Sequence, residues 1–178
     1  MSNTTSPIAV VFGSNSPLAG EPDYEEAHAL GRLLAQAGYA VATGGYFGTM
    51  EAASQGAREA GGHTIGVTTS IFDGARPRPN AYLDEEIKFP TLFQRLHYLV
   101  TMADAWVALP GGIGTLSEVA LTWSLMQVGE MKRRPFVLVG ELWRKTIGGF
   151  SSDYYVRPQH RELIRYVDNV QQVIELLK

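Results

Sequence analysis

The sequence predicts an α/β fold, a doubly wound parallel sheet with helices on both faces, in a single domain over residues 1–178. Short apolar segments alternate with helical segments of ten or more residues, which is typical of βαβ units. Three of the apolar segments end in Gly-Gly or Gly-Ser, at the edge where parallel sheets bind ligands. The 178 residues are 45% hydrophobic and 19% charged, which suits one globular domain.

The expected strands are short, mostly apolar segments that are followed by glycine, proline or polar residues. The first, Ile8–Phe12 with the sequence IAVVF, has apolar residues at successive positions, as in a parallel strand that is buried on both faces. The strands are expected at residues 8–12, 39–43, 63–68, 86–89, 105–109, 136–139 and 164–167.

The expected helices have apolar residues at intervals of three and four positions. The first ends at Gly38, since glycine commonly terminates helices, and the last is expected to be capped by Asp168. The helix over residues 115–128 is apolar on most sides and is therefore expected to be largely buried. Residues 71–82 are expected to be irregular because prolines interrupt them. The helices are expected at residues 24–37, 49–60, 91–103, 115–128, 142–147 and 168–177.

The composition excludes several classes of protein. The chain contains no cysteine, which excludes disulfides, a thiolate nucleophile and cysteine-based metal sites. The formal net charge of −3 argues against general nucleic-acid binding. No apolar segment approaches the ~18 residues of a membrane span, and the first residues lack the pattern of a signal peptide. We therefore expect a cytoplasmic protein with neither a membrane nor a nucleic-acid partner.

The histidines and aromatic residues give little functional signal. The four histidines show no metal-ligand spacing such as HExxH, so we expect no metal and no cofactor. The three tryptophans are most simply core residues. Tyr46 and Phe47 differ, because the tip of a glycine-flanked loop is a poor place to bury a ring. These two rings are candidates for stacking on a base.

The strongest functional signal is the segment Pro110–Glu118, with the sequence PGGIGTLSE, which follows an expected strand and opens an expected helix. Glycines allow an anion to approach the backbone closely, and the N–H groups at a helix start attract phosphate. Alternatively, Thr115 and Glu118 form a capping box, because Thr-x-x-Glu has the required spacing. No lysine follows the glycines, and Ser117 replaces the third glycine of a dinucleotide fingerprint, so a monophosphate fits better than ATP or NAD. The expected phosphate-binding residues are Gly111, Gly112, Ile113, Gly114 and Thr115.

Two further segments give weaker signals. Residues 43–53, TGGYFGTMEAA, again join a strand, a glycine turn and a helix start, and a plain helix–sheet packing turn explains them equally well. Glu51 lies in the first helical turn, where compensation of the helix dipole explains an acidic residue without a function. Arg95 is a lone arginine on an expected helix, and without other information it is most simply a solvated surface residue. Further substrate contacts are expected from Gly13, Ser14, Gly44, Gly45 and Tyr46, which follow the ends of strands, and from Glu51 at the start of the next helix.

The two glycine motifs together resemble the LOG ("Lonely Guy") family, the cytokinin riboside 5′-monophosphate phosphoribohydrolases that are often described as lysine decarboxylases. The motif PGGxGTxxE at residues 110–118 and the motif GGxxGxMEA at residues 44–52 carry this resemblance, which covers most of the chain. It implies a Rossmann-like fold, usually a homodimer, and a small-molecule nucleotide substrate. The implied reaction is hydrolysis of the bond between base and ribose in a nucleoside 5′-monophosphate.

The resemblance also implies roles for individual residues. The glutamate of the family motif falls on Glu118, and the essential arginine falls on Arg95. We expect Glu118 to stabilise positive charge on the ribose and to orient or deprotonate water. Arg95 stays protonated and is expected to hold phosphate or ribose oxygens and to balance the charge of Glu118. Glu51 is a candidate acid for the leaving base.

Two departures from the family pattern keep a second function open. Phe93 and Leu96 stand where the family often has histidine and lysine, and Tyr46 replaces the third glycine of a Gly-Gly-Gly loop. These changes leave room for a non-catalytic carrier or sensor of a phosphorylated pterin or nucleotide, such as a molybdenum cofactor carrier. A DNA-processing protein on a related fold is disfavoured by the acidic charge.

Overall fold

A computed structural model describes residues 6–74 and 78–177. The expectation for the start of the chain falls largely on residues 1–5, and part of the segment expected to be irregular falls on residues 75–77, so both lie outside the described residues. Within the described ranges, none of the helices combines the length and the apolar composition needed to cross a membrane.

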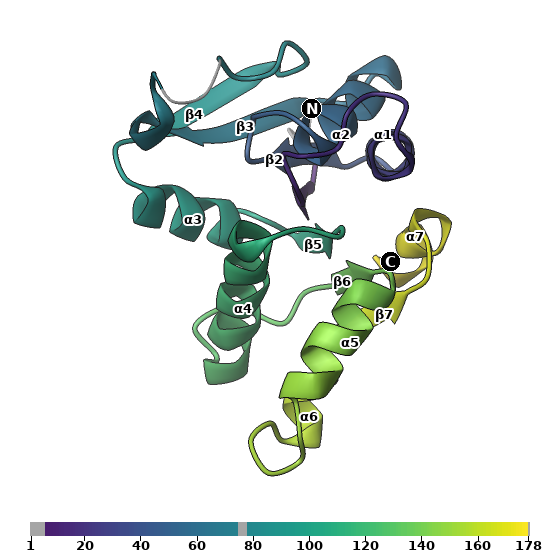
Figure 1. The fold of residues 1–178 in the computed structure, drawn as a ribbon, viewed down its shortest axis with the longest axis vertical. Coiled ribbons are helices and arrows are strands. Elements are labelled where there is room, and N and C mark those ends of the chain that lie inside the picture. The colour runs from purple at the N-terminus through teal and green to yellow at the C-terminus, as the bar shows by residue number, and fades with distance from the viewer. Residues whose placement is uncertain (1–5, 75–77, 178) are drawn as a thin grey trace, which may run out of the picture.

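The centre of the fold is a seven-stranded sheet in the order β4-β3-β2-β1-β5-β6-β7 (Figure 1). All neighbouring strands are parallel, which confirms the predicted sheet, and the strand order reverses between β1 and β5. The observed bounds agree with the expected strands to within one residue. The strands are β1 (Ile8–Phe12), β2 (Ala40–Thr43), β3 (Thr64–Thr69), β4 (Glu85–Phe89), β5 (Ala105–Ala108), β6 (Phe136–Val139) and β7 (Arg165–Val167).

Helices cover both faces of the sheet, as a doubly wound fold requires. In Figure 1, α1, α2 and α7 lie on one side of the strands, and α3, α4 and α5 lie on the other. The α-helices are α1 (Pro22–Gln36), α2 (Thr49–Glu59), α3 (Leu92–Thr101), α4 (Ile113–Val128), α5 (Glu141–Phe150), α6 (Pro158–Arg161) and α7 (Val173–Leu176). Short 3-10 helices are formed by Ser70–Phe72 and Val170–Gln172.

The two faces of the sheet form two separate hydrophobic clusters, because successive residues of a strand point to opposite faces. In β1, Val10 and Phe12 pack with α3, α4 and α5, whereas Ala9 and Val11 pack with α1 and α2. All four side chains are almost completely buried. Burial on both faces explains why the β1 sequence is apolar throughout instead of alternating.

Helices α1 and α2 approach each other closely through glycines. A Cβ atom at Gly31 of α1 would lie 1.9 Å from the carbonyl oxygen of Ala53, and one at Gly56 of α2 would lie 1.9 Å from that of His28. Only residues without a side chain permit this backbone contact. The contact fixes α2 against α1 and thereby places the start of α2 beside the loop after β1.

Several expectations about helices are wrong, and α5 also extends three residues beyond its expected end at residue 147. Helix α4 begins at Ile113 instead of residue 115, because Gly112 is its N-cap. The expected terminal helix over residues 168–177 is a 3-10 turn followed by the short α7, and Asp168 does not cap it, since its carboxylate pairs with Arg144. Helix α4 is also not largely buried. One side of it faces solvent, with Ile113 and Val128 80% and 68% exposed.

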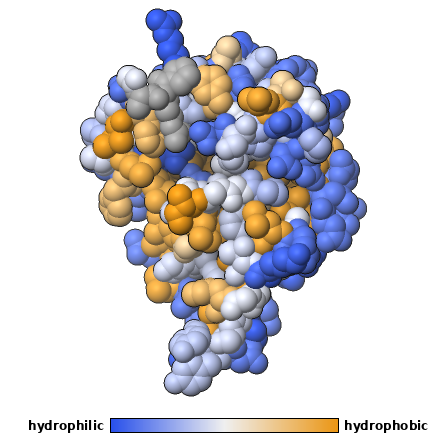
Figure 2. Space-filling view, in the orientation of Figure 1, coloured by the Kyte–Doolittle hydropathy of each residue, from blue (hydrophilic) through white to orange (hydrophobic). Residues whose placement is uncertain are grey.

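Part of the exposed apolar surface lies at the start of α3 and α4. Leu92 and Phe93 of α3 are 47% and 73% exposed, which adds to the exposed side of α4. Figure 2 shows apolar residues gathered over the part of this face where α3 and α4 lie.

Candidate functional site

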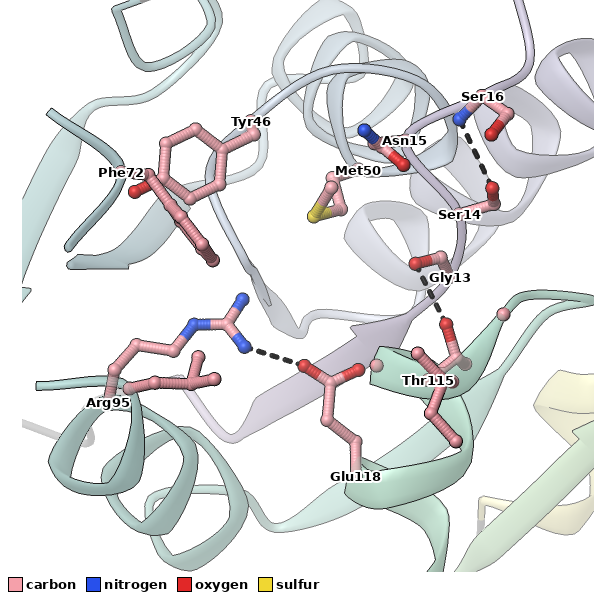
Figure 3. Close-up of a pocket in the computed structure, with 14 residues that line it drawn as sticks. Gly13, Ser14, Asn15, Ser16, Tyr46, Met50, Phe72, Arg95, Thr115 and Glu118 are labelled. Carbon is pink, nitrogen blue, oxygen red and sulfur yellow. Dashed lines mark hydrogen bonds and ion pairs between the residues drawn. The ribbon is translucent and has the colours of Figure 1, made fainter. Parts of the chain in front are cut away.

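A cavity of about 350 Å³ opens at the carboxyl ends of β1, β2 and β5, where the strand order reverses (Figure 3). This is the position at which open parallel sheets bind ligands, since the loops diverge there to opposite faces of the sheet. We call it the site cavity. Its lining consists of Gly13, Ser14, Asn15, Ser16, Tyr46, Met50, Phe72, Leu92, Arg95, Gly112, Ile113, Gly114, Thr115 and Glu118.

Arg95 enters the site cavity from the first turns of α3. The helix is capped by Thr91, whose Oγ1 accepts a hydrogen bond from the backbone N–H of Gln94 at 3.2 Å. The Arg95 side chain is buried, and its Nε donates to the carbonyl oxygen of Val67 in β3 at 2.9 Å. On the other side the guanidinium lies against Gly44, where a Cβ atom would collide with Nη2. The alternative of a solvated surface arginine is therefore wrong.

Glu118 of α4 is the ion-pair partner of Arg95. Nη1 of Arg95 donates to Oε1 of Glu118 at 2.7 Å, and both side chains are only 9% exposed. Within the described ranges, the Glu118 carboxylate accepts no other hydrogen bond. No buried side-chain oxygen there lacks a hydrogen-bond partner, so Oε2, which has none, must be accessible. Since Glu118 lines the site cavity, we conclude that Oε2 faces it. Burial raises the pKa of Glu118, and the charge and hydrogen bond of Arg95 oppose that increase.

The start of α4 forms one wall of the site cavity. The first N–H groups of a helix, here those of Ile113, Gly114 and Thr115, have no partner within the helix. Gly112 and Gly114 have no atom within 4 Å of an added Cβ, so the backbone is open to a ligand on this side. Together with the positive end of the helix dipole, these groups make the wall suitable for a phosphate.

The alternative of a capping box at the start of α4 is wrong. Thr115 is the third helical residue and not the N-cap, and its Oγ1 donates to the carbonyl oxygen of Gly13 at 3.0 Å. The Glu118 carboxylate pairs with Arg95 and does not return to its own helix start. Both side chains are therefore directed across the site and not along their own backbone.

The loop after β1 is connected to two helices. In addition to the bond from Thr115, the carbonyl oxygen of Ser14 accepts hydrogen bonds from N–H and Oγ1 of Thr49, at 2.9 and 3.0 Å. Gly13 is required here, because a Cβ atom would lie 2.1 Å from Oγ1 of Thr49. These contacts place Ser14 and the following Asn15 and Ser16 at the rim of the cavity.

Two aromatic rings close the side of the cavity away from Thr115 (Figure 3). Tyr46 is 5% exposed, so the expectation that this ring is not buried is wrong. Its ring meets that of Phe72 edge to face, with centroids 5.6 Å apart. An aromatic wall of this kind is suited to a flat, apolar part of a ligand.

The structure does not bring all the expected site residues to the cavity. Gly44, Gly45, Glu51 and Gly111 are absent from the described lining. Gly44 makes room for Arg95, Gly45 has a φ of +77° that favours glycine, and a Cβ at Gly111 would collide with Thr115. Burial raises the pKa of Glu51, but this carboxyl group interacts with Tyr24 on α1.

Sequence reasoning missed five lining residues: Asn15, Ser16, Met50, Phe72 and Leu92. Asn15 and Ser16 directly follow the expected contact Ser14, and Met50 belongs to the glycine motif of residues 44–52. These three residues could have been found by including the neighbours of the residues that were expected at the site. Phe72 lies in the segment that is expected to be irregular, where no pattern points to the site.

The described side chains of the site do not form a set of metal ligands. Within the described ranges, no group of three or more histidine, aspartate or glutamate side chains could hold a metal ion. Glu118 is the only carboxylate in the described lining of the cavity, and its Oε1 is already paired with Arg95.

The chain is similar to a known family, to proteins of that family and to solved structures. The model of a family described as "Possible lysine decarboxylase" matches residues 50–177. A cytokinin riboside 5′-monophosphate phosphoribohydrolase of Mycobacterium tuberculosis is 31% identical over 171 residues, which cover 92% of this chain and 89% of the relative. A solved structure of the molybdenum cofactor binding protein of Rippkaea orientalis is 27% identical, with a TM-score of 0.75 and coverage of 97% and 96% of the two chains. The molybdenum cofactor carrier protein of Chlamydomonas reinhardtii is 26% identical, with a TM-score of 0.73 and coverage of 96% and 95%.

Proposed function

Because the chain belongs to the LOG family, we propose that it hydrolyses the N-glycosidic bond of a nucleoside 5′-monophosphate, such as AMP or a cytokinin riboside 5′-monophosphate, to a free base and ribose 5-phosphate. The observation that carries the proposal is the buried Arg95–Glu118 pair beside the helix start of α4. The pair leaves one carboxylate oxygen facing the cavity, next to a wall that suits a phosphate.

The start of α4 binds the 5′-phosphate in this proposal. The N–H groups of Ile113, Gly114 and Thr115 donate to the phosphate oxygens, and the helix dipole favours their negative charge. A phosphate at this position brings the attached ribose toward Glu118, which lies one turn further along the same helix. Binding energy from a part of the substrate that does not react thus positions the carbon that does.

Glu118 supports cleavage at C1′ of the ribose. The bond to the base breaks with its electrons going to the base, and positive charge develops on the ribose. Oε2 of Glu118 stabilises that charge and accepts a proton from the water that attacks C1′. The proton taken from water balances the one that the departing base acquires. The described lining contains no second carboxylate, so Glu118 is the group that handles this proton.

Arg95 positions the carboxylate and binds oxygen atoms of the substrate. A guanidinium stays protonated at neutral pH and therefore cannot act as the base. Its Nε and Nη1 are engaged by Val67 and Glu118, which fixes the plane of the group. Nη2, on the side of Gly44, is the nitrogen that we assign to ribose or phosphate oxygens.

The name of the matching family suggests lysine decarboxylation, and the site does not fit that reaction. A pyridoxal phosphate decarboxylase needs a lysine that forms a Schiff base with the cofactor. The described lining of the site cavity contains no lysine. Lys88 lies in a neighbouring cavity and is paired with Asp73 at 2.7 Å.

A second candidate function is a carrier of the molybdenum cofactor. It is favoured by the likeness, over nearly the whole of this chain, to solved structures of one protein named a molybdenum cofactor binding protein and one named a molybdenum cofactor carrier protein. In this case the start of α4 binds the phosphate of the cargo, and the Arg95–Glu118 pair has a structural role.

Chromatography separates the two candidates. The purified protein is incubated with AMP, CMP and N6-isopentenyl-AMP, and the products are examined for free base and ribose 5-phosphate. We expect release of the base from at least one nucleotide by the wild type and not by Glu118→Gln. Binding of nucleotide without any release under varied conditions would reject the hydrolase and favour the carrier.

We also propose that two copies of the chain form a homodimer through the exposed face of α3 and α4. Helix α4 is apolar on most sides although one side faces solvent, and Phe93 of α3 is 73% exposed beside it. Exposed apolar surface of this kind marks association surfaces. Light scattering coupled to size-exclusion chromatography should give twice the chain mass of 19.5 kDa, and Phe93→Asp should reduce it to that of one chain.

A further inference from the structure

Tyr46 stands between the site cavity and a second cavity of about 190 Å³. The second cavity lies against β3 and β4, and its lining includes Thr68, Glu86 and Lys88. Tyr46 and Phe72 line both cavities. The two rings therefore form a partition that limits how far a ligand can extend from the site cavity in this direction.

The Tyr46 ring is fixed in the partition by hydrogen bonds at both ends. Its hydroxyl group donates to the carbonyl oxygen of Thr69 and accepts from the N–H of the same residue, at 3.1 Å in both cases. At the backbone, Nδ2 of Asn80 donates to the carbonyl oxygen of Tyr46 at 2.9 Å. Turning the ring away would break both hydrogen bonds to the buried Thr69, which is unfavourable.

The partition lies where the base of a bound nucleotide would end. Figure 3 shows Tyr46 and Phe72 on the side of the cavity away from Thr115, with Arg95 and Glu118 on its floor. With the phosphate at the start of α4 and C1′ at Glu118, the base points toward the two rings. A substituent on the far edge of the base would need the space that Tyr46 fills.

We infer that Tyr46 is a specificity-determining residue that restricts the site to nucleoside 5′-monophosphates with an unsubstituted base. This inference rests on the proposed function and narrows it, because an N6-isopentenyl group on the base would have to extend into the space that the Tyr46 ring fills. Removing the ring would join the two cavities and admit the larger base.

The test compares AMP with N6-isopentenyl-AMP in the wild type, Tyr46→Gly, Tyr46→Phe and Phe72→Ala. A pocket distinguishes substrates that differ by even one methylene by about tenfold or more, so we expect the wild type to prefer AMP in kcat/KM by at least that factor. Tyr46→Gly should remove or reverse this preference. Tyr46→Phe keeps the ring and should keep the preference. Phe72→Ala removes the other ring of the partition, at a residue that is less buried than Tyr46. This variant should shift the preference in the same direction as Tyr46→Gly. It keeps the test valid if Tyr46→Gly does not fold.

The dissociation constants of both nucleotides, measured by calorimetry, separate this inference from the proposed function. If no variant releases a base, the hydrolase proposal fails, yet a gain in affinity for N6-isopentenyl-AMP on Tyr46→Gly still supports the partition. If base release is observed and both Tyr46→Gly and Phe72→Ala keep the wild-type preference, the partition is overturned and the hydrolase stands. A wild type that accepts the isopentenyl nucleotide as well as AMP also overturns it.

Discussion

A Cβ atom at Gly44 would lie 2.1 Å from Nη2 of Arg95, closer than any non-bonded contact allows. Gly44 has no positive φ, so its lack of a side chain serves the arginine and not the backbone conformation. The end of β2 thereby helps to determine where the guanidinium meets the Glu118 carboxylate.

We expect Gly44→Ala to reduce activity while the protein remains folded. The added methyl group would collide with the flexible ends of Arg95 and Met50, and both can move, so the structural change is confined to the site. Gly148→Ala in α5, where no atom lies within 4 Å, is the matched control and should be active and slightly more stable, by about 0.5–1 kcal/mol. Kinetics and thermal unfolding of both variants check this, and a fully active Gly44→Ala would contradict the assigned role of Arg95.

Glu118→Gln should abolish most turnover. The amide has nearly the same shape but cannot accept a proton or balance positive charge, and loss of a positioned acid or base typically reduces the rate by ~10²–10⁴. Glu130→Gln, in the exposed turn after the same helix, changes the net charge equally and should retain full activity. The measurement is the release of base from AMP, with circular dichroism to confirm folding. Equal rates for the two variants would remove Glu118 from the mechanism.

Arg95→Met should weaken nucleotide binding and destabilise the fold. Removing one partner of a buried ion pair leaves the other charge uncompensated and typically reduces the free energy of unfolding by about 3–5 kcal/mol. Glu118→Leu in the same chain removes that charge, so the double variant should be more stable than Arg95→Met alone. Denaturant unfolding of the single and double variants measures this coupling, and additive effects would show that the pair contributes nothing.

The pH dependence of kcat/KM should report Glu118. Burial raises its pKa above the ordinary value of 4.5, and the mechanism needs the ionised form, so activity should fall as the pH drops through a pKa above 4.5. Since the folded state binds this proton more tightly than the unfolded state, the stability contributed by protonated Glu118 is present at low pH and is lost as the pH rises through the folded pKa. A pH–rate profile that is flat down to 4.5 argues against the assignment.

Gly31→Ala should destabilise the fold without affecting the chemistry directly. The methyl group would meet the backbone of Ala53 in α2, which cannot move aside as a side-chain end can. Overpacking of this kind typically reduces stability by about 1–3 kcal/mol. Thermal unfolding measures the loss. Gly149→Ala in α5, with no atom within 4 Å, is the control, and similar melting temperatures for the two variants would disprove the close contact of α1 and α2.

The sequence predicted the sheet well because its strands are buried on both faces. The continuous apolar segment Ile8–Phe12 has no other simple interpretation, and its bounds match those of β1. The expected start of α4 differs from the observed one because Thr115 carries the local signal of an N-cap, whereas the cap is Gly112, which has no side chain. The pattern at the end of the chain could not reveal that Arg144 pairs with Asp168 and so removes its capping role.

The candidate site was predictable only in part. Arg95 has no local signal, and the resemblance to a family, not its surroundings in sequence, singled it out. Its partners Val67, Gly44 and Glu118 come from three separate segments, so only the folded chain shows that the guanidinium is buried among them. The place of Phe72 in the site could not be predicted for the same reason. Its ring contacts Tyr46, and this contact joins a 3-10 turn after β3 to the loop after β2.

The hydrogen bonds that Thr115 and Thr49 make to the loop after β1 have a consequence for the thermodynamics of ligand recognition. Two successive carbonyl groups, those of Gly13 and Ser14, are fastened by α4 and by α2 before any ligand arrives. Because the loop is already ordered, ligand binding loses less conformational entropy than it would with a flexible loop. Nucleotide should therefore meet a rigid receptor, and the backbone of residues 13–16 should superpose in free and bound crystals.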